Sequence, residues 1–404
     1  MIESNKPLDL CLVAGRFFPH YAGPAERFRR YAPGIHELGV DLRVITVRRS
    51  DTEPEIDRVD DILVERRSVS TDNDPTRTNT SRLLPSVIRG FHQTGKWPDV
   101  LQLLTPPMKT DIPYLWQARA QGLPLLLVST MMLREIRNLR DRLYNWWIFS
   151  PFDRIVTSSS VMTDQLARLA LFSSRIETIP NGVDCQRFRP ARSPDKRAEL
   201  RQKFGFEPDD EIIIYVGSIT PRKGVDILVS AWQEIIRQHP HARLLLVGPH
   251  HRPSGESLSN DTINAFCDEV DVLVSQSLAP WRVTFTGEVS NVEEYLQLAD
   301  IFVFPSMFEG MPNVVPEAMA VGLPCVITPF EGLPTEFGRP GYEYVLTERK
   351  RSGIADAVMN LLRNPTLRST VSQNALAWIR RNMDVKVSLE RYEKVYRQLA
   401  RRRF

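Results

Sequence analysis

Two acidic residues flank a short turn in the second half of the chain, and their spacing suits one extended ligand. Glu309 and Glu317 are separated by seven residues in the run 308–320 (FEGMPNVVPEAMA), which follows an apolar stretch. A turn from a strand into a helix presents unpaired N–H groups, and the helix dipole favours an anion there. A pyrophosphate would fit, with one carboxylate at sugar hydroxyls and the other at ribose hydroxyls. The alternative is that Glu317 complements the helix N-terminus and Glu309 is a solvated loop residue.

Two adjacent cations precede a second helix. Arg222 and Lys223 lie in the run 215–225 (YVGSITPRKGV), which also reads as a strand, a turn and a helix start. Cations at a helix N-terminus oppose the helix dipole, so this pair indicates an anion that offsets the cost. Taken alone, the dipeptide would suit a solvated loop better. Together with the acidic pair it predicts a site for a diphosphate-containing ligand.

The elements that must position these residues alternate in type along the chain. Helical patterns separate short apolar runs, which is typical of parallel sheets covered on both faces. The expected strands are 8–13, 42–47, 100–104, 123–128 and 154–157 in the first half, and 212–216, 243–247, 283–285, 301–304 and 324–327 in the second. The pattern predicts an α/β fold of two doubly wound domains facing a cleft, with ligands beyond the carboxyl ends of the strands.

The boundaries follow from length and local composition, because 404 residues are too many for one ordinary domain. Residues 188–210 are rich in Pro, Arg and Asp and are interpreted as a linker, although Ser193 and Pro194 suit a helix start within them. One apolar stripe predicts a helix over 225–236, and further helices are expected at 354–363 and 389–403. We therefore expect domains at 1–187 and 188–385, and a C-terminal helix, 386–404, that packs back on the first domain.

Composition excludes several classes of protein. The chain is 42% hydrophobic and 25% charged, which is close to the average of globular proteins. Its formal net charge is only +3, and positive and negative residues are interspersed through most of the chain, so no basic patch for nucleic acid is indicated. No signal-like or membrane-spanning apolar run occurs. Four scattered cysteines without a CxxC pair indicate neither a disulfide framework nor a zinc ribbon (Cys11, Cys185, Cys267 and Cys325). A cytoplasmic protein, soluble or peripheral at the membrane, is expected.

In order and spacing, the two motifs resemble the C-terminal domain of the family 4 retaining glycosyltransferases, which have the GT-B fold of two Rossmann-like domains. The resemblance covers nearly the whole chain. It is also carried by five further runs: 17–23 (FFPHYAG), 179–184 (IPNGVD), 285–289 (FTGEV), 299–306 (ADIFVFPS) and 322–326 (GLPCV). The resemblance implies transfer of a sugar from a nucleotide-diphosphate sugar, UDP or GDP, with retention of anomeric configuration. The implied acceptor is a carbohydrate, a lipid-linked sugar or a small molecule.

The resemblance also implies residue roles. Arg222 and Lys223 would hold the donor diphosphate, Glu309 the sugar and Glu317 the ribose, while no cofactor or metal is expected because two cations and a helix N-terminus neutralise the charge. Gly23 would let the first domain's backbone approach the phosphates. The other donor-binding residues would be Gly217 and Ser218 after the first strand of the domain, Gly287 and Val289 beside the nucleobase, and Gly310, Met311, Pro312, Asn313 and Val314 in the acidic turn.

Two departures from the family pattern keep other functions open. Ser218 stands where many relatives carry Arg, and Ser129-Thr130-Met131-Met132 stands where many carry a His. A sugar-nucleotide epimerase or a non-catalytic sugar-nucleotide-binding protein therefore remains an alternative. Asp72-Asn73-Asp74 is interpreted as a solvated loop. His239, His241, His250 and His251 lack a helical HExxH frame or a third nearby ligand, so zinc is not expected.

Two surface features could together dock on an anionic membrane. The last helix is basic, and an aromatic cluster lies in the first domain; the residues are Arg391, Lys394, Arg397, Arg401, Arg402 and Arg403, and Tyr144, Trp146, Trp147, Ile148 and Phe149. The competing interpretation is a solvated helix packed on the first domain and an ordinary core cluster.

Overall fold

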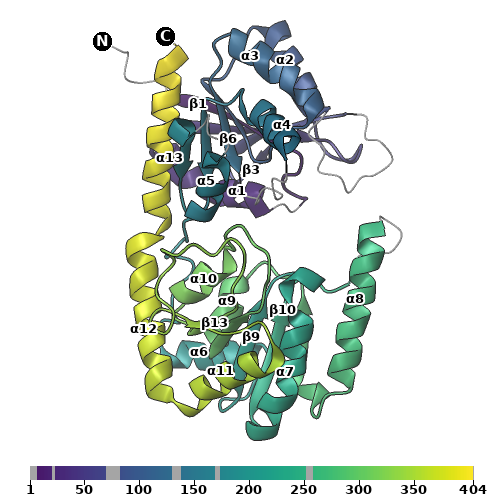
Figure 1. The fold of residues 1–404 in the computed structure, drawn as a ribbon, viewed down its shortest axis with the longest axis vertical. Coiled ribbons are helices and arrows are strands. Elements are labelled where there is room, and N and C mark those ends of the chain that lie inside the picture. The colour runs from purple at the N-terminus through teal and green to yellow at the C-terminus, as the bar shows by residue number, and fades with distance from the viewer. Residues whose placement is uncertain are drawn as a thin grey trace. The chain divides into compact units, whose positions relative to one another are not determined.

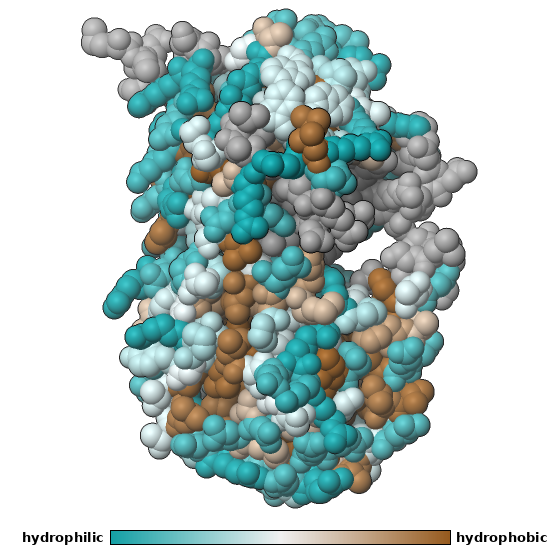
Figure 2. Space-filling model, in the orientation of Figure 1, coloured by the Kyte–Doolittle hydropathy of each residue, from teal (hydrophilic) through white to brown (hydrophobic). Residues whose placement is uncertain are grey.

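The computed structural model describes residues 7–20, 23–69, 82–129, 138–168, 173–251 and 258–403. Contacts divide the chain into an N-terminal unit, Met1–Pro180 with Lys386–Phe404, and a C-terminal unit, Asn181–Val385. Each unit holds a twisted sheet with helices around it (Figure 1). Polar side chains cover most of the face drawn in Figure 2, and apolar residues gather in places over the C-terminal unit. None of the described helices is both long and apolar enough to cross a bilayer.

The N-terminal unit is built on an eight-stranded sheet in the order β3-β4-β2-β1-β5-β6-β7-β8. Neighbouring strands are parallel except for the β3–β4 hairpin. The strands are β1 Leu8–Ala14, β2 Val40–Val47, β3 Ile56–Val59, β4 Ile62–Arg67, β5 Val100–Leu103, β6 Leu125–Ser129, β7 Arg154–Thr157 and β8 Ile176–Thr178. Its helices are α1 Gly23–Glu37, α2 Leu83–Thr94, α3 Ile112–Ala120, α4 Leu139–Phe149, α5 Ser160–Ala167 and α13 Val385–Ala400.

The C-terminal helix α13 packs on the N-terminal unit through an apolar stripe. Leu389, Tyr392, Val395, Tyr396 and Leu399 are buried along it. The Tyr396 hydroxyl donates to Gln102 Oε1 at 2.9 Å, and both side chains are fully buried. The opposite face carries the basic residues, of which Arg391 pairs with Glu177 at 3.4 Å. The buried apolar residues recur every three or four positions, so they form one face of the helix. That face determines which side of α13 packs on the N-terminal unit.

The C-terminal unit is built on six parallel strands in the order β11-β10-β9-β12-β13-β14. The strands are β9 Glu211–Val216, β10 Ala242–Val247, β11 Val283–Gly287, β12 Ile301–Phe304, β13 Cys325–Ile327 and β14 Val345–Leu346. The helices are α6 Pro194–Lys203, α7 Val225–Gln238, α8 Leu258–Ser275, α9 Val292–Leu298, α10 Val314–Ala320, α11 Arg351–Arg363 and α12 Pro365–Asn382. The predicted stripe of α7 is buried in the core, with Trp232 fully enclosed.

The predicted α/β class is confirmed, and each of the ten expected strands is present within two residues of its predicted ends. The interpretation of 188–210 as a linker is not supported, because these residues belong to the C-terminal unit. Ser193 does cap α6, accepting a hydrogen bond from the Lys196 amide at 3.1 Å. Arg201, on the same helix, is buried against Asp300 at 2.7 Å. Residues Asp72–Asp74 and Thr130–Met132, discussed above, lie outside the described residues.

Candidate functional site

The two charged motifs lie at the carboxyl ends of two neighbouring strands. β9 and β12 pair in parallel, with Ile213 opposite Ile301, so the loops that follow them meet at one edge of the sheet. The amide of Met307 donates to the carbonyl of Arg222 at 2.9 Å, which joins one loop to the other. Topology therefore brings together two segments that are more than 80 residues apart in sequence.

Three charged side chains meet between these loops. Glu309 Oε1 lies 2.6 Å from Lys223 Nζ and also pairs with Arg222. The hydroxyl of Ser306 donates to the same oxygen at 2.9 Å. Lys223 and Glu309 are 11% and 12% exposed, whereas Arg222 is 48% exposed and also donates to the carbonyl of Phe308 at 3.0 Å. The cluster thus has a sheltered ion pair and one cation that faces solvent.

Burial sets the electrostatics around Lys223. Desolvation lowers the pKa of Lys223, and the neighbouring Glu309 carboxylate opposes that shift. The ammonium also lies 5.0 Å from the centre of the Phe304 ring. Tyr215, on β9, is fully buried, and burial raises its pKa. Its hydroxyl donates to the carbonyl of Ser218 at 3.0 Å. Tyr215 therefore stays neutral and holds the backbone of Ser218.

Two glycines permit the close approach of the loops. Gly224 has φ of 70°, and a Cβ there would lie 2.4 Å from the carbonyl oxygen of Pro305. Gly332 comes against the other side of the acidic turn, where a Cβ would lie 2.1 Å from the carbonyl oxygen of Glu309. Both contacts are with backbone atoms, so any side chain at either position would push the Glu309 loop out of place.

The acidic turn is also fixed from a distant segment. Asn181 Nδ2 donates to Asn313 Oδ1 at 2.8 Å and to the carbonyl of Met311 at 3.3 Å. Met311 and Pro312 are buried, while Asn313 is exposed immediately before α10. Glu317 lies in the first turn of α10, which begins at Val314, and is partly buried. The turn is thus a supported structure rather than a free loop.

The remaining predicted residues lie at three places. Gly217 and Ser218 follow β9 directly, and the Gly217 amide donates to the carbonyl of Val247 at 2.8 Å. Gly287 ends β11 and accepts a hydrogen bond from the Gly248 amide at 3.0 Å, while Val289 packs partly buried against the core. Gly23 is the first residue of α1 in the N-terminal unit.

Arg349 joins the site without a sequence signal. Its Nε donates to the carbonyl of Pro305 at 2.9 Å and its Nη2 to that of Pro221 at 3.4 Å, so it holds both loops. Ser306 and Asn181 were also missed as contributors, although each lies in one of the runs that carry the family resemblance. Only the fold shows that these residues support Glu309 and its turn.

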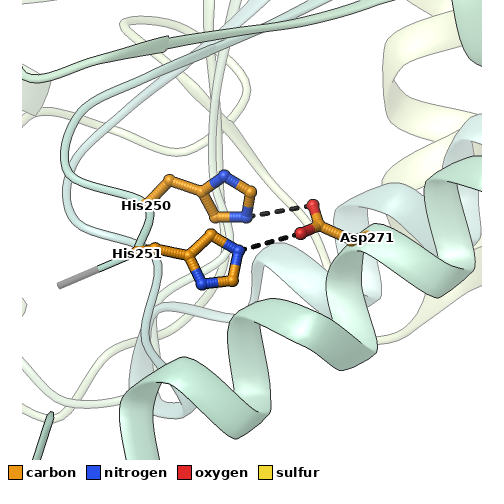
Figure 3. Close-up of side chains that lie close together, drawn as sticks. All are labelled: His250, His251 and Asp271. Carbon is orange, nitrogen blue, oxygen red and sulfur yellow. Dashed lines mark hydrogen bonds and ion pairs between the residues drawn. The ribbon is translucent and has the colours of Figure 1, made fainter. Parts of the chain in front are cut away.

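The expectation that His250 and His251 lack a third ligand is wrong. Asp271, twenty residues beyond His251 and on α8, lies 3.0 Å from Nε2 of each imidazole (Figure 3). Sequence spacing concealed the group because the loop after β10 and the middle of α8 approach each other only in the folded unit.

The sequence matches two family models, one in each half. Residues 210–364 match the model described as glycosyl transferases group 1, and residues 22–182 match that of the glycosyl transferase 4-like domain. The chain belongs to the group 1 glycosyltransferases of family 4. The predicted family is therefore confirmed.

Named relatives and solved structures agree with this family membership. The D-inositol 3-phosphate glycosyltransferase of Segniliparus rotundus is 34% identical over 183 residues, which cover 45% of this chain and 38% of that protein. A second such protein, from Catenulispora acidiphila, is 32% identical over 55% of this chain and 51% of its own length. The matched region therefore spans about half or less of these curated relatives.

Solved structures resemble this glycosyltransferase over nearly the whole chain. The sucrose-phosphate synthase from Thermosynechococcus elongatus has a TM-score of 0.77 at 19% identity, covering 97% of this chain and 99% of that one. HepE from Anabaena, solved in complex with UDP, has a TM-score of 0.74 at 17% identity, covering 97% and 100%. These similarities confirm the predicted GT-B fold.

Proposed function

We propose that this protein transfers a glycosyl group from a nucleoside-diphosphate sugar to an acceptor hydroxyl, with retention of anomeric configuration. The observation that carries the proposal is the buried pair of Lys223 and Glu309, with Arg222 beside it, at the carboxyl ends of β9 and β12. Ligands of open parallel sheets bind at this edge. The C-terminal unit is then the donor-binding part, and the acceptor belongs to the N-terminal unit.

The diphosphate is assigned to the two cations. Arg222 is half exposed and Lys223 is largely buried. A phosphate that contacts both side chains loses part of its hydration and gains two charge-assisted hydrogen bonds. The N–H groups at the start of α10 and its dipole add to this field. Glu309, already beside both cations, then faces the sugar, and Glu317 takes the ribose. Gly287 and Val289 are assigned to the nucleobase of UDP or GDP.

The chemistry follows from these charges. The bond from the anomeric carbon to the diphosphate oxygen breaks, and its electron pair stays on that oxygen, where Lys223 and Arg222 stabilise the negative charge. The acceptor oxygen forms its bond to the anomeric carbon on the same face of the sugar. Its proton passes to the departing phosphate oxygen. Glu309 stabilises the positive character that develops on the sugar as the bond breaks.

A peripheral membrane contact is a further part of the proposal, and α4 carries it. Tyr144, Trp146 and Trp147 are 36–41% exposed, and Leu139 and Leu143 are 70% and 59% exposed, whereas only Ile148 and Phe149 are in the core. In Figure 2, apolar and pale, intermediate residues lie together over α4. Lys109 stacks 5.0 Å from the Tyr144 ring. Aromatic rings with neighbouring cations suit an anionic bilayer, and a lipid-linked acceptor would be presented there.

A donor screen tests the activity. UDP-, GDP- and ADP-sugars are titrated into the protein by calorimetry, and hydrolysis or transfer is followed by NMR of the anomeric proton. We expect one nucleotide class to bind and the product to keep the donor's anomeric configuration. Absence of binding to all three classes, or a product of inverted configuration, would contradict the proposal. Binding without turnover towards any tested carbohydrate or lipid-linked acceptor would favour a non-catalytic sugar-nucleotide-binding protein.

A further inference from the structure

The C-terminal unit contains a second cluster of polar groups that the glycosyl transfer does not use. It comprises His250 and His251, in the loop after β10, and Asp271 on α8 (Figure 3). We propose that these three residues bind a divalent metal ion such as Zn²⁺. The cluster shares no residue with the group formed by Arg222, Lys223 and Glu309.

The ligand atoms converge on one point. Nε2 of His250 lies 3.0 Å from Oδ1 of Asp271, and Nε2 of His251 lies 3.0 Å from Oδ2. One ligand atom from each residue lies within 4.8 Å of the others. Three atoms bound at about 2.0–2.2 Å from one Zn²⁺ would lie within about 4 Å of one another, so only small side-chain rotations separate this cluster from a loaded site.

One imidazole nitrogen is buried close to the Asp271 carboxylate. His250 Nε2 is buried and lies 3.0 Å from Oδ1 of Asp271, so the nitrogen and the carboxylate face each other at a distance that one ion could bridge after a small movement. A metal ion between this nitrogen and the carboxylate satisfies both groups at once.

The His250 ring is held in place before any ion binds. It stacks on Phe285 with the ring centres 4.3 Å apart and the planes 3° from parallel. The thiol of Cys267, one turn before Asp271 on α8, donates to the His250 carbonyl at 3.0 Å. The loop is thus attached to the helix that carries the third ligand. Preorganisation of this kind lowers the cost of binding a metal.

The ligand set selects the class of ion. Two imidazoles and one carboxylate suit Zn²⁺, Co²⁺, Ni²⁺ or Fe²⁺, whereas Ca²⁺ and Mg²⁺ prefer oxygen ligands. His251 and Asp271 are 45% and 41% exposed, so solvent can complete the coordination from the open side.

Titration of the full-length protein with Co²⁺ and Zn²⁺ tests the site after dialysis against a chelator. We expect one Co²⁺ per chain, with visible absorption of a nitrogen and oxygen site and without the near-ultraviolet bands of thiolate ligands, and one Zn²⁺ by calorimetry. His251→Gln and Asp271→Asn should each weaken binding at least ten-fold. The matched control is His241→Gln, because His241 pairs with one carboxylate, Asp209, at 3.4 Å and belongs to no group of three possible metal ligands among the described residues.

The metal titrations test the proposed metal site independently of the donor site. Circular dichroism establishes that the variants fold, and nucleotide binding is measured on the same samples, so failure of the donor proposal is seen separately. The metal proposal is overturned if the wild-type protein binds no ion at unit stoichiometry. It is also overturned if His251→Gln binds as tightly as the wild type, or if His241→Gln loses as much affinity as Asp271→Asn.

Discussion

Lys223 and Glu309 form an ion pair of 2.6 Å in which each side chain is almost wholly buried. Arg222 joins the same carboxylate from the solvent side. A sheltered charge pair of this kind is costly to break from one side only, because the remaining charge stays desolvated. The pair therefore holds both side chains in place in the absence of ligand, and a phosphate at the proposed diphosphate site would share the cations with Glu309.

Removing the buried cation should weaken donor binding while the fold survives. We expect Lys223→Ala to lose one charge-assisted contact with the diphosphate, worth roughly 1.5–3 kcal/mol, or roughly 10- to 150-fold in dissociation constant. Arg222 and Ser306 still hold Glu309 in this variant. Calorimetry with the nucleotide measures the loss. Lys196→Ala, at an exposed lysine paired with Glu199 at 2.8 Å, is the control and should bind as the wild type does. Unchanged affinity in Lys223→Ala would remove Lys223 from the diphosphate site.

The lowered pKa of Lys223 predicts an alkaline limit to activity. Burial places this pKa below the ordinary lysine value of 10.5, so the charge needed for the diphosphate is lost at a lower pH than in a solvated lysine. The kcat/KM for the donor reports ionisations of the free enzyme, and it should fall as pH rises towards 10.5. Lys223→Arg keeps its charge over this range and should shift that decline upward. An identical alkaline profile in wild type and Lys223→Arg would contradict the assignment.

Asp111 should make the protein less stable at neutral pH than at mildly acid pH. It is fully buried at the start of α3, where it accepts a hydrogen bond from the Met108 amide at 2.9 Å, and burial raises its pKa from 3.8 to about 6. A carboxyl group whose pKa is raised on folding contributes stability that is complete below about 3.8 and lost as pH rises through about 6.

Replacement with the neutral isostere tests this sign. Between pH 5 and pH 8 the Asp111 contribution to the free energy of unfolding should fall by roughly 1 kcal/mol. Asp111→Asn should therefore gain stability relative to the wild type at pH 8 and lose that advantage towards pH 4, as measured by urea unfolding. A difference between the two proteins that does not vary with pH would show that Asp111 titrates as an ordinary carboxylate.

The exposed aromatic residues of α4 should bind anionic vesicles. We expect the protein to float with liposomes containing phosphatidylglycerol at low salt, and the variant Trp146→Ser with Trp147→Ser to stay in solution, because indole rings favour the membrane interface. Trp281→Ser, at a 71% exposed tryptophan of the C-terminal unit, should float like the wild type. If the wild-type protein fails to float with these vesicles, the membrane contact is excluded under those conditions.

The sequence predicted the strands of the two sheets better than the hairpin at the sheet edge or the packing of the segments that join the strands. Buried parallel strands such as β9 and β12 are continuous apolar runs, which length and composition reveal. The β3–β4 hairpin was missed because charged residues interrupt both strands, as at Arg58 in the edge strand β3 and Glu65 in β4. Residues 188–210 look polar enough for a linker because Arg201, whose charge is balanced by Asp300, counts as a surface residue in composition alone.

Non-local pairs account for what the sequence could not reveal about the site. The motif pattern placed Arg222, Lys223 and Glu309 in one ligand site, but not in contact with one another. Arg349, which holds both site loops, has no local signature, since its partners Pro221 and Pro305 are far from it in sequence. His250 and Asp271 likewise come together only when the end of β10 packs beside α8.

The two glutamates of the acidic turn should fail in different ways when each is changed to Gln. Glu317→Gln keeps the size of the side chain and one acceptor oxygen but loses the charge at the proposed ribose site. Contacts with the ribose hardly change during reaction, so the loss should appear mainly in donor affinity. Glu309→Gln leaves Arg222 and Lys223 without their carboxylate, so their attraction for a diphosphate is kept or increased. Its loss should therefore appear in turnover.

The reason for the second effect is the charge that develops on the sugar. As the bond to phosphate breaks, a carboxylate at Glu309 stabilises the positive character, and its neutral isostere cannot, so we expect a rate loss of roughly ten-fold or more, at about 1.4 kcal/mol per decade. Steady-state donor hydrolysis or transfer, with nucleotide binding by calorimetry, separates the two effects. Glu331→Gln, at an exposed residue beside the same loop, is the control and should behave as the wild type. Equal losses of affinity alone in both variants would refute the division of roles, and full activity in both would refute glycosyl transfer at this site.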